Sequence, residues 1–304
     1  MKAVYTLEDL RAGLPVNEAG QELCLAVVGN PVEHSKSPQL HQAALEQAGV
    51  AGFYGRLHLE AGELAQAFAL GRSLGMLGMN VTVPHKHEAM AACDRLDESA
   101  EFLGAVNTVC FTPEGLVGYN TDGGGLSLAV AEAFSQSLND FEVTILGAGG
   151  GAGAAVAAQC AIEGVKSLHL VNRSMDKLAI LQQHLSVLPV EAAADVDISN
   201  HSFADTDLPE VLAKSSLIIN ATSLGLNSDD ALPCDLASID ASNQCYYDMV
   251  YQPDLTPWLQ QAQSRGAKIA DGLTMLLHQG ALAFKLFTHK QPDIELMRRS
   301  LYTK

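Results

Sequence analysis

The sequence predicts an α/β protein with two domains, on three observations. The chain has 304 residues, and one domain usually holds about 150 residues. Short β-branched or apolar runs alternate with longer helical patterns, which is typical of parallel sheets built from β–α–β units. A strand, a glycine-rich turn and an alanine-rich helix follow one another from residue 143. We place a domain boundary near residue 122, where polar loop clusters give way to this glycine-turn unit.

The expected elements follow from these runs. Strands are expected at residues 23–28, 54–59, 79–81, 105–111, 143–146, 168–171, 217–220 and 244–248. Helices are expected to begin near residues 38, 61, 124, 151, 176, 208, 256 and 273.

The composition excludes several classes of protein. Hydrophobic residues make up 48% of the chain and charged residues 17%, which supports a large core and excludes general disorder. The net charge of −17 argues against non-specific binding to nucleic acid or to an anionic membrane, because both need a basic surface. We therefore expect neither kind of partner, and an anionic ligand would need a locally basic site.

The cysteines and the N-terminus indicate the cellular compartment in which the protein works. Six cysteines are scattered along the chain without a CxxC pair or metal-finger spacing, so we expect reduced thiols in a reducing compartment. The first residues contain no apolar segment of the kind that a signal peptide needs. We expect a cytoplasmic protein.

Residues 143–162 imitate a membrane span, because these 20 residues carry no charge. However, five glycines lie between residues 147 and 153 of the segment, where they would weaken a helix. A strand, a turn and a helix fit the segment better than a span.

This turn carries the pattern Gly147-x-Gly149-x-x-Ala152 between a strand and a helix, as a dinucleotide site requires. Gly147 would allow the tight turn, Gly149 the approach of a diphosphate to the backbone, and Ala152 close packing of helix on strand. The start of the helix would offer its N–H groups to the phosphates. The alternative is an ordinary tight turn, but the context favours the nucleotide.

The next strand indicates which nucleotide is bound. An NAD site usually has an acidic residue at the end of this strand. Here the strand ends in Asn172, Arg173 and Ser174, with Lys177 one helical turn beyond. Two cations and a hydroxyl suit a 2′-phosphate, so the pattern favours NADP over NAD. The alternative is a pair of solvated cations at the start of a surface helix.

Polar clusters also follow the expected strands of the first half. Ser37 precedes Pro38 at the start of a helix, so it could bind a ligand or serve as the N-cap. The period of two places Asn80 and Thr82 on one face of their strand. Lys86 follows the turn after that strand, and its alternative is an ordinary surface lysine.

Two further polar residues stand near the proposed domain boundary. Asn107 interrupts an otherwise apolar strand, where a buried amide must find partners or cost roughly 1–3 kcal/mol. Its alternative role is structural pairing across the sheet. Asp122 lies before three glycines, which suit a turn or a hinge, and it could merely cap the next helix.

Common metal sites and nucleophile motifs are missing from the sequence. There is no HExxH pattern on a helix and no GxSxG elbow, and a cation between His85 and His87 would be repelled by Lys86. We expect no metal. The residues discussed so far therefore indicate a nicotinamide-type cofactor site beside a pocket for a small polyhydroxylated ligand.

Nine sequence blocks, taken in order, resemble the shikimate dehydrogenase family over nearly the whole chain. The blocks are SKSP at 35–38, NVTVPHK at 80–86, GAVNT at 104–108, GYNTDG at 118–123, GAGG at 147–150, NRS at 172–174, ATSLG at 221–225, DMVYQP at 248–253 and DGLTMLLHQ at 271–279.

The resemblance implies reversible reduction of 3-dehydroshikimate to shikimate with NADPH, a step towards chorismate and the aromatic amino acids. It implies that Lys86 and Asp122 form the catalytic pair and contact the substrate. The other substrate-binding residues that it implies are Ser35, Ser37, Asn80, Thr82, Asn107, Tyr251 and Gln279. An ammonium can donate a proton to the oxygen of the reacting carbon or stabilise that oxygen as an alkoxide, and a carboxylate can orient the ammonium.

The resemblance also implies the cofactor residues. These are Gly147, Ala148, Gly149, Gly150 and Gly151 for the diphosphate, Asn172, Arg173, Ser174 and Lys177 around the ribose phosphate, Thr222, Met249 and Gly272 towards the nicotinamide, and Glu98 by family pattern alone. Because Gln279 would have to join the substrate, the C-terminal helices would return to the first domain. The implied domains are a substrate domain at 1–122 with 272–304 and a Rossmann-type, doubly wound NADP domain at 123–271.

The chain departs from the family pattern at a few positions, and other functions stay open. Gly153 stands where an arginine is usual, Lys177 replaces a frequent arginine, and Thr274 and His278 replace smaller residues. The alternatives are a quinate/shikimate dehydrogenase, a slow paralogue, a methylenetetrahydrofolate-type dehydrogenase and a silent metabolite sensor. The sequence is compatible with a monomer or a homodimer.

Overall fold

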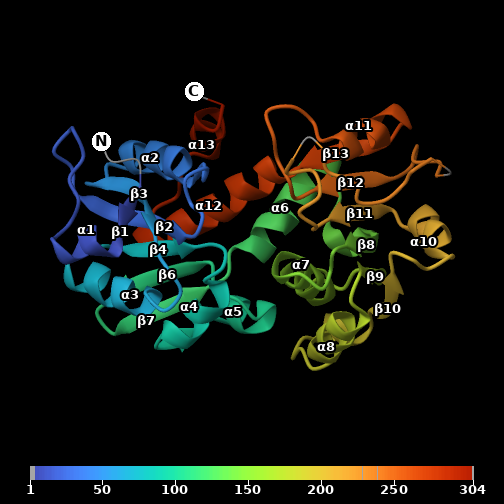
Figure 1. Ribbon diagram of the computed structural model, residues 1–304, viewed down its shortest axis with the longest axis horizontal. Helices are drawn as coiled ribbons and strands as arrows, with labels where there is room; N and C mark the ends of the chain where they lie inside the picture. The colour runs from blue at the N-terminus through green and yellow to red at the C-terminus, as the bar shows by residue number, and fades with distance from the viewer. Residues whose placement is uncertain (1–3, 228, 238, 303–304) are drawn as a thin grey trace. The chain divides into compact units, whose positions relative to one another are not determined.

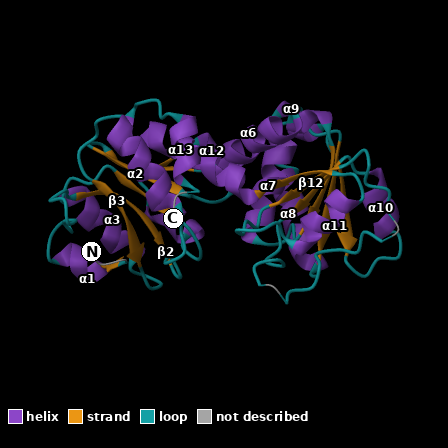
Figure 2. Ribbon diagram, turned by 90° about the horizontal axis from the view of Figure 1, so that it is seen from above, coloured by secondary structure: helices purple, strands orange, loops and turns teal. Residues whose placement is uncertain are grey.

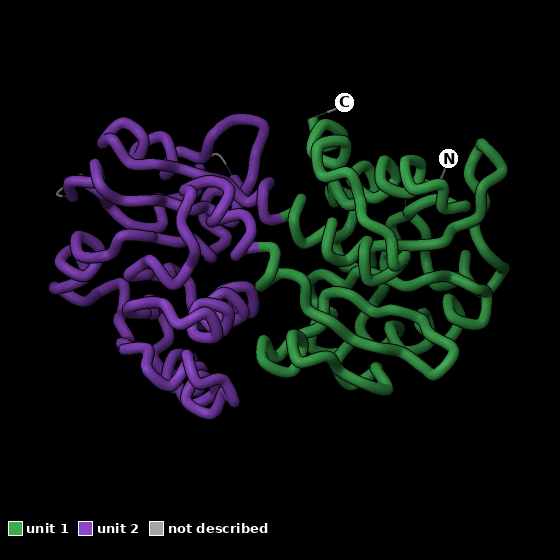
Figure 3. Tube along the Cα trace, turned by 180° about the vertical axis from the view of Figure 1, so that it is seen from behind, with its two compact units in different colours: residues 1–125, 276–304 green, residues 126–275 purple. Residues whose placement is uncertain are grey.

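The computed structural model describes residues 4–227, 229–237 and 239–302 and contains two compact units. Unit 1 comprises residues 1–125 and 276–304, and unit 2 comprises residues 126–275 (Figure 3). In each unit a central sheet carries helices on both faces (Figure 2). The functional domains proposed from the sequence, 1–122 with 272–304 and 123–271, have boundaries a few residues away from those of the units.

Unit 1 is built on a mixed sheet of seven strands. In spatial order the strands are β1 (Tyr5–Thr6), β3 (Phe53–His58), β2 (Leu23–Gly29), β4 (Gly78–Val81), β6 (Thr108–Thr112), β7 (Gly115–Tyr119) and β5 (Arg95–Leu96). Its helices are α1 (Leu7–Arg11), α2 (Ser37–Gln47), α3 (Leu64–Ser73), α4 (Lys86–Ala92), α5 (Glu98–Leu103), α13 (Ile294–Ser300) and the greater part of α12 (Gly272–Thr288).

The directions of these strands decide where the polar clusters meet. Strands β1, β3, β2 and β4 are parallel, whereas β6 runs antiparallel to both β4 and β7. The carboxyl ends of β2, β4 and β7 therefore lie at the same edge of the sheet as the beginning of β6 (Figure 1). The polar segments at residues 29–38, 80–86, 105–109 and 118–122 all adjoin this edge.

Unit 2 is built on six parallel strands. In spatial order they are β10 (Asp197–Ser202), β9 (Ser167–Asn172), β8 (Glu142–Leu146), β11 (Leu217–Asn220), β12 (Cys245–Asp248) and β13 (Lys268–Asp271). Its helical elements are most of α6 (Asp122–Phe134), the 3₁₀ turn η1 (Leu138–Asp140), α7 (Gly151–Ile162), α8 (Met175–Leu185), α9 (Glu191–Ala194), α10 (Leu208–Lys214) and α11 (Pro257–Ser264).

This strand order is that of a doubly wound dinucleotide-binding sheet, whose first and fourth strands lie side by side at its centre. Here these two strands are β8 and β11, which pair along residues 143–146 and 217–220. The loops that follow them diverge to opposite halves of the sheet. Ligands of such sheets bind at this point, and the predicted α/β fold class is confirmed.

Both sheets are held by buried apolar side chains. Residues such as Leu23, Leu57 and Phe68 form the core of unit 1, and they are less than 1% exposed. Residues such as Leu146, Ile218 and Trp258 form a cluster in unit 2. The segment at 143–162 is β8, a glycine turn and α7, as expected. Within the described residues, no helix combines the length and apolar character needed to cross a bilayer.

Some predicted elements were wrong. The strand expected at 105–111 begins only at Thr108, and Asn107 lies just before it, with its backbone bonded to Val81 and Tyr119. Five strands were not predicted: β1, β5, β7, β10 and β13. The strands β1 and β5 have only two residues and β10 has the polar sequence DISNHS, so these three offered no apolar run that marks a strand. The short strands β7 (GLVGY) and β13 (KIAD) were overlooked.

Candidate active site

The centre of the polar edge of unit 1 is an ion pair between Lys86 and Asp122. Lys86 is the first residue of α4 and Asp122 is the first residue of α6. The Lys86 Nζ donates to Asp122 Oδ2 at 2.5 Å, and the two side chains are 28% and 17% exposed. Lys86 is therefore not a free surface lysine. Asp122 is thus the first residue of α6, and its carboxylate bonds to side chains of other elements.

Asn107 holds the other oxygen of this carboxylate. Its Nδ2 donates to Asp122 Oδ1 at 2.8 Å and to Thr121 Oγ1 at 3.0 Å. Its Oδ1 accepts from the backbone N–H of Thr121 at 2.8 Å and from Thr108 Oγ1 at 2.9 Å. The buried amide thus has the partners it needs. Asn107 therefore pairs with neighbouring segments at the edge of the sheet, which is its structural alternative, and it also lies beside the ion pair.

The loop after β2 and the start of α2 carry two of the predicted substrate residues, Ser35 and Ser37. Ser37 is buried and is the first residue of α2, whose N-cap is Lys36, so the idea that Ser37 caps the helix is wrong. The backbone N–H of Ser37 donates to Ser35 Oγ at 3.3 Å. The Arg56 guanidinium donates to the Ser35 carbonyl at 2.6 and 3.2 Å and so fixes the loop.

Gln279 approaches the same region from α12. Its Nε2 donates to the Leu276 carbonyl at 2.8 Å, within the helix. A Cβ on Gly125 would lie 2.7 Å from Gln279 Cβ and 2.9 Å from its backbone nitrogen. Only a residue without a side chain allows α12 to pack this closely on the turn of α6 that begins with Asp122. Asn80 lies buried on β4, and Thr82 follows that strand.

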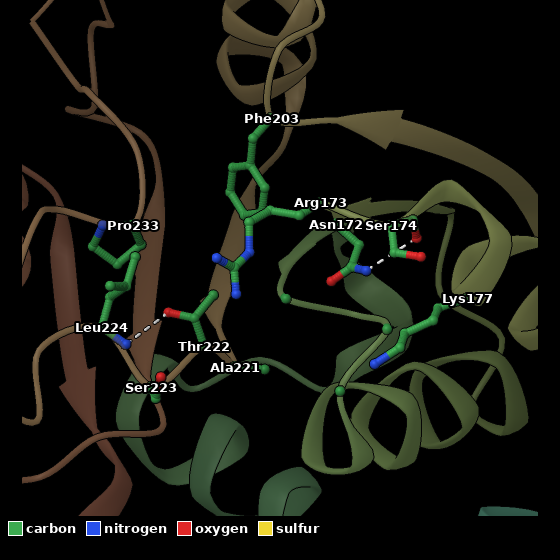
Figure 4. Close-up of a pocket in the computed structure, with 13 residues that line it drawn as sticks. Asn172, Arg173, Ser174, Lys177, Phe203, Ala221, Thr222, Ser223, Leu224 and Pro233 are labelled. Atoms are coloured by element: carbon green, nitrogen blue, oxygen red, sulfur yellow. Dashed lines mark hydrogen bonds between the residues drawn. The ribbon is translucent and has the colours of Figure 1, made fainter.

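A second site occupies the switch point of unit 2 (Figure 4). It is a cavity of 530 Å³, and its walls come from the turns after β8, β9, β10 and β11. The lining residues are Gly147, Gly149, Gly150, Asn172, Arg173, Ser174, Lys177, Phe203, Ala221, Thr222, Ser223, Leu224 and Pro233. Many of the predicted cofactor residues are among them.

The glycine turn is shaped by close contacts. Gly147 has φ of +85°, which favours glycine. A Cβ on Gly149 would lie 2.5 Å from Asn172 Nδ2 and 3.0 Å from Lys177 Cβ, so a side chain there would obstruct the cradle. The helix α7 begins at Gly151, after Gly150 as N-cap, without a side chain that uses its first N–H groups. A diphosphate group fits these features.

The packing role expected of Ala152 was wrong. Ala152 is exposed, whereas Gly153 is buried. A Cβ on Gly153 would lie 2.3 Å from the Gly147 carbonyl oxygen and 2.8 Å from Ala148 Cα. Gly153 is therefore the residue that lets α7 pack on the turn, and an arginine at this position would require the backbone to move.

The cations of the second half extend into this cavity. Figure 4 shows Arg173 and Lys177 pointing into the space that Thr222 and Leu224 line on the other side. Arg173 and Lys177 are exposed side chains, and Asn172 Nδ2 donates to the Ser174 carbonyl at 3.0 Å. Ser174 is the N-cap of α8 but makes no side-chain capping bond. This cation-lined end of the cavity suits a phosphate group.

A buried network holds the wall opposite these cations. Asn220 Oδ1 accepts from Thr222 N at 3.0 Å and from Thr222 Oγ1 at 2.7 Å, while its Nδ2 donates to Asp248 Oδ1 at 2.8 Å. Asp248 also accepts from Thr256 Oγ1 at 2.7 Å. Burial raises the pKa of the Asp248 carboxyl, and the hydrogen bonds from Thr256, Val250 and Asn220 oppose this effect.

The remaining predicted residues are distributed over the two units. In unit 2, Met249 and Gly272 are in contact, because a Cβ on Gly272 would lie 2.1 Å from the Met249 carbonyl oxygen. Tyr251 is half-buried after β12, and burial raises its pKa. Glu98 is exposed at the start of α5, in unit 1. No contact within the described residues assigns it to the cofactor cavity.

Sequence reasoning missed several residues of these sites. Tyr54 and Thr108 belong to the polar network of unit 1, and Phe203 and Pro233 line the cavity of unit 2. Tyr54 lies within a predicted strand without a polar cluster around it, and Phe203 follows a strand that was not predicted. Only Thr108 carried a signal, since it stands next to Asn107 in the sequence.

Comparison with known proteins identifies the relatives of this chain. Residues 27–109 match the model of the shikimate dehydrogenase substrate-binding domain, and residues 272–302 match that of the shikimate 5′-dehydrogenase C-terminal domain. A shikimate dehydrogenase (NADP⁺) of Bacillus licheniformis is 38% identical over 274 residues, which cover 90% of this chain and 94% of the relative.

Solved structures agree with this relationship. A shikimate dehydrogenase in complex with NADP⁺ has a TM-score of 0.83 at 32% identity, covering 96% of this chain and 99% of that chain. The Thermus thermophilus enzyme with NADP(H) and shikimate has a TM-score of 0.78 at 31% identity, covering 92% and 98%. A quinate dehydrogenase from Corynebacterium glutamicum with NAD has a TM-score of 0.82 at 28% identity, covering 91% and 98%.

The curated relatives are thus similar over nine tenths of the chain at identities well above those of chance. The similarity includes both halves of the protein, and it confirms the resemblance that the nine sequence blocks indicate. The chain belongs to the shikimate dehydrogenase family.

Proposed function

We propose that this protein catalyses the reversible, NADP-dependent interconversion of shikimate and 3-dehydroshikimate. The observation that carries the proposal is the bonded set of Lys86, Asp122 and Asn107 at one edge of unit 1. An ammonium and a carboxylate held together are suited to the oxygen of a carbon that is being oxidised or reduced. The relatives that share these blocks are named shikimate dehydrogenases (NADP⁺).

The chain's own residues supply the acid–base and orienting functions. Lys86 bonds to the reacting oxygen, and in the reducing direction it donates the proton that this oxygen gains. Asp122 orients the ammonium, because one of its oxygens accepts from Lys86 while the other is fixed by Asn107. The Ser35 and Ser37 hydroxyls and the amides of Asn80 and Gln279 would bind the hydroxyl and carboxylate groups of the substrate.

The cavity of unit 2 fits the cofactor that this reaction requires. The glycine turn and the start of α7 would hold the diphosphate, and Arg173, Ser174 and Lys177 would hold the 2′-phosphate of the adenosine ribose. When bound, NADP supplies the acceptor or donor of the hydride. We assign Thr222, Met249 and Gly272 to the nicotinamide end of the site.

We further propose that the protein works in a reducing compartment such as the cytoplasm. The six cysteines are free, and burial raises the pKa of each thiol, to about 11 for Cys24 and about 12 for Cys110. Thiols of this kind are mainly protonated and unreactive near neutral pH. The proposed function is compatible with either a monomer or a homodimer.

The test of the function is turnover by the purified protein, measured from the absorbance of reduced cofactor. Shikimate and quinate are each combined with NADP⁺ and with NAD⁺. We expect strong turnover only with shikimate and NADP⁺. A preference for quinate or NAD⁺ would assign the chain to the sister activity, and shikimate binding without turnover would favour a metabolite sensor.

A further inference from the structure

The unit 1 site contains one buried phenol that the mechanism above does not use. Tyr54 lies on β3, its side chain is only 4% exposed, and its hydroxyl donates to Asn80 Oδ1 at 2.8 Å. Burial raises the pKa of this phenol well above its ordinary value, although a hydrogen-bonding interaction with the Ser37 hydroxyl opposes the shift. The phenol is therefore protonated and able to donate throughout the working pH range.

The phenol bonds to the oxygen of the Asn80 amide. The Asn107 backbone carbonyl can only accept, so it takes the NH₂ group of Asn80 and leaves the Asn80 oxygen facing the Tyr54 hydroxyl, which donates to it. The two protons of Asn80 Nδ2 are then directed to Thr108 Oγ1, at 3.0 Å, and to the Asn107 carbonyl, at 3.3 Å. Both donors of Asn80 are thus used inside the protein. Asn80 Oδ1 keeps one acceptor position for a further group.

The same directionality continues to the catalytic pair. Thr108 Oγ1 receives a proton from Asn80 and donates its own to Asn107 Oδ1 at 2.9 Å. The Asn107 oxygen also accepts from the Thr121 backbone N–H at 2.8 Å, and its Nδ2 donates to Asp122 Oδ1 at 2.8 Å, so these two partners fix the direction of the Asn107 amide. From Tyr54 to Asp122, four consecutive hydrogen bonds have their donors pointing the same way. These bonds connect the Tyr54 hydroxyl to the Asp122 carboxylate in one network, in which each bond can strengthen its neighbours.

A neutral ring holds the phenol in place. His41 on α2 stacks on Tyr54 with ring centroids 4.4 Å apart and an angle of 8° between the planes. His41 is fully buried, and neither ring nitrogen has a hydrogen-bond partner among the described residues. Burial lowers the pKa of His41 to about 3, so the ring brings no charge to the network. Its contribution is packing that restricts the Tyr54 ring.

We propose that Tyr54 is a positioning residue of the substrate site, whose hydroxyl holds the oxygen of Asn80 in place at one end of the hydrogen-bond chain that reaches Asn107 and the Asp122 carboxylate. The proposal rests on the function proposed above, because it requires that the unit 1 site binds shikimate. Tyr54 need not contact the substrate. It acts through Asn80, which keeps an oxygen rather than an NH₂ group available to a substrate hydroxyl.

The test is a comparison of two tyrosine-to-phenylalanine variants. Tyr54→Phe removes the hydroxyl but keeps the ring that stacks on His41. Tyr246→Phe is the matched control, because Tyr246 is also buried and donates to a side-chain amide, Gln244 Oε1 at 2.9 Å, in unit 2. We expect both variants to lose similar thermal stability. Only Tyr54→Phe should raise KM for shikimate, by about tenfold, with KM for NADP⁺ unchanged.

A double-mutant cycle tests the route of the effect. If Tyr54 acts through Asn80, then Tyr54→Phe should add less than about twofold to the loss of kcat/KM already caused by Asn80→Ala. Additive losses would overturn the positioning role. Thr108→Val removes a later hydroxyl of the same chain without changing its shape, and it should also raise KM for shikimate, so it carries the test if Tyr54→Phe does not fold.

The outcomes separate the two proposals. An active wild-type enzyme whose KM for shikimate is unchanged in Tyr54→Phe, or raised equally in Tyr246→Phe, contradicts the role of Tyr54 alone. A wild-type protein that neither binds nor turns over shikimate contradicts the proposed function, and the role of Tyr54 falls with it.

Discussion

At the scale of single residues, Gly153 shows why a family pattern needs the structure beside it. The sequence shows only that an arginine usual in the family is replaced, which suggests a lost phosphate contact. The structure shows that Gly153 packs directly on the Gly147 carbonyl oxygen. In this chain the position supports the turn that would hold the cofactor.

We expect Gly153→Ala to destabilise the protein and weaken the binding of NADP⁺. The added methyl group would lie 2.3 Å from a backbone oxygen, so the turn or α7 has to move. Thermal unfolding and calorimetric titration with NADP⁺ measure the two effects. The matched variant is Gly151→Ala, whose Cβ has no neighbour within 4 Å and which should not lower the unfolding temperature. Equal stability of the two variants would refute this packing argument.

Arg173 carries a second prediction at this scale. Arg173→Asp should lower the ratio of kcat/KM for NADP⁺ to that for NAD⁺ by about ten- to a hundredfold, because a cation that would bond the 2′-phosphate is replaced by an anion. Arg173→Lys keeps the charge and should lose much less. The preference is measured with both cofactors at saturating shikimate. An unchanged ratio in the aspartate variant would remove Arg173 from the phosphate site.

At the scale of elements, the loop after β11 depends on one buried amide. Asn220 bonds to Thr222, to the Leu224 carbonyl and to Asp248, and it is fully buried. These bonds join the ends of β11 and β12 beside the cavity of unit 2. The loop is therefore held by side chains of the strands rather than by its own sequence.

We expect Asn220→Ala to weaken NADP⁺ binding and to lower the free energy of unfolding by about 1–3 kcal/mol. The reason is that Asp248, a buried carboxylate, loses a donor at the same time as the loop loses its support. Chemical denaturation and NADP⁺ titration measure these changes. Asn243→Ala removes an exposed amide of the same unit and serves as the control. Wild-type affinity for NADP⁺ in Asn220→Ala would contradict the role of the network.

The elements also show how far the sequence could predict this protein. The parallel strands of unit 2 are apolar runs followed by helices, and all four that form its centre were predicted. The short or polar strands β1, β5 and β10 have no such pattern and pair only because their neighbours offer free edges. Lys86, Asn107 and Asp122 come close together because β6 runs antiparallel to both β4 and β7, so that the start of β6 lies beside the ends of β4 and β7. The spacing of these residues along the chain does not reveal this arrangement.

At the scale of the whole molecule, the buried histidine His41 affects stability at acid pH. Its pKa is lowered from 6.5 to about 3 in the folded protein. Between these two values the unfolded chain binds the proton and the folded protein does not, so the free energy of unfolding falls as the pH is lowered from 6.5 towards 3. The fall amounts to about 1.4 kcal/mol for each pH unit within this window.

His41→Phe keeps an aromatic ring against Tyr54 and removes this titration. We expect the variant to lose less stability than the wild type between about pH 6.5 and pH 4. Urea denaturation at several pH values gives the comparison, with His289→Phe, an exposed position, as the control. Parallel stability curves for His41→Phe and the wild type would show that His41 is not the titrating group.

The central claim is that the ion pair of unit 1 carries the chemistry of the whole enzyme. Its most direct test is the rate of shikimate oxidation by Lys86→Met with NADP⁺, together with the thermal unfolding of the variant. We expect kcat to fall by about a thousandfold or more while the folded structure is retained, because the ammonium that bonds the reacting oxygen is gone. A folded Lys86→Met protein whose kcat stays within about tenfold of the wild type would contradict the claim.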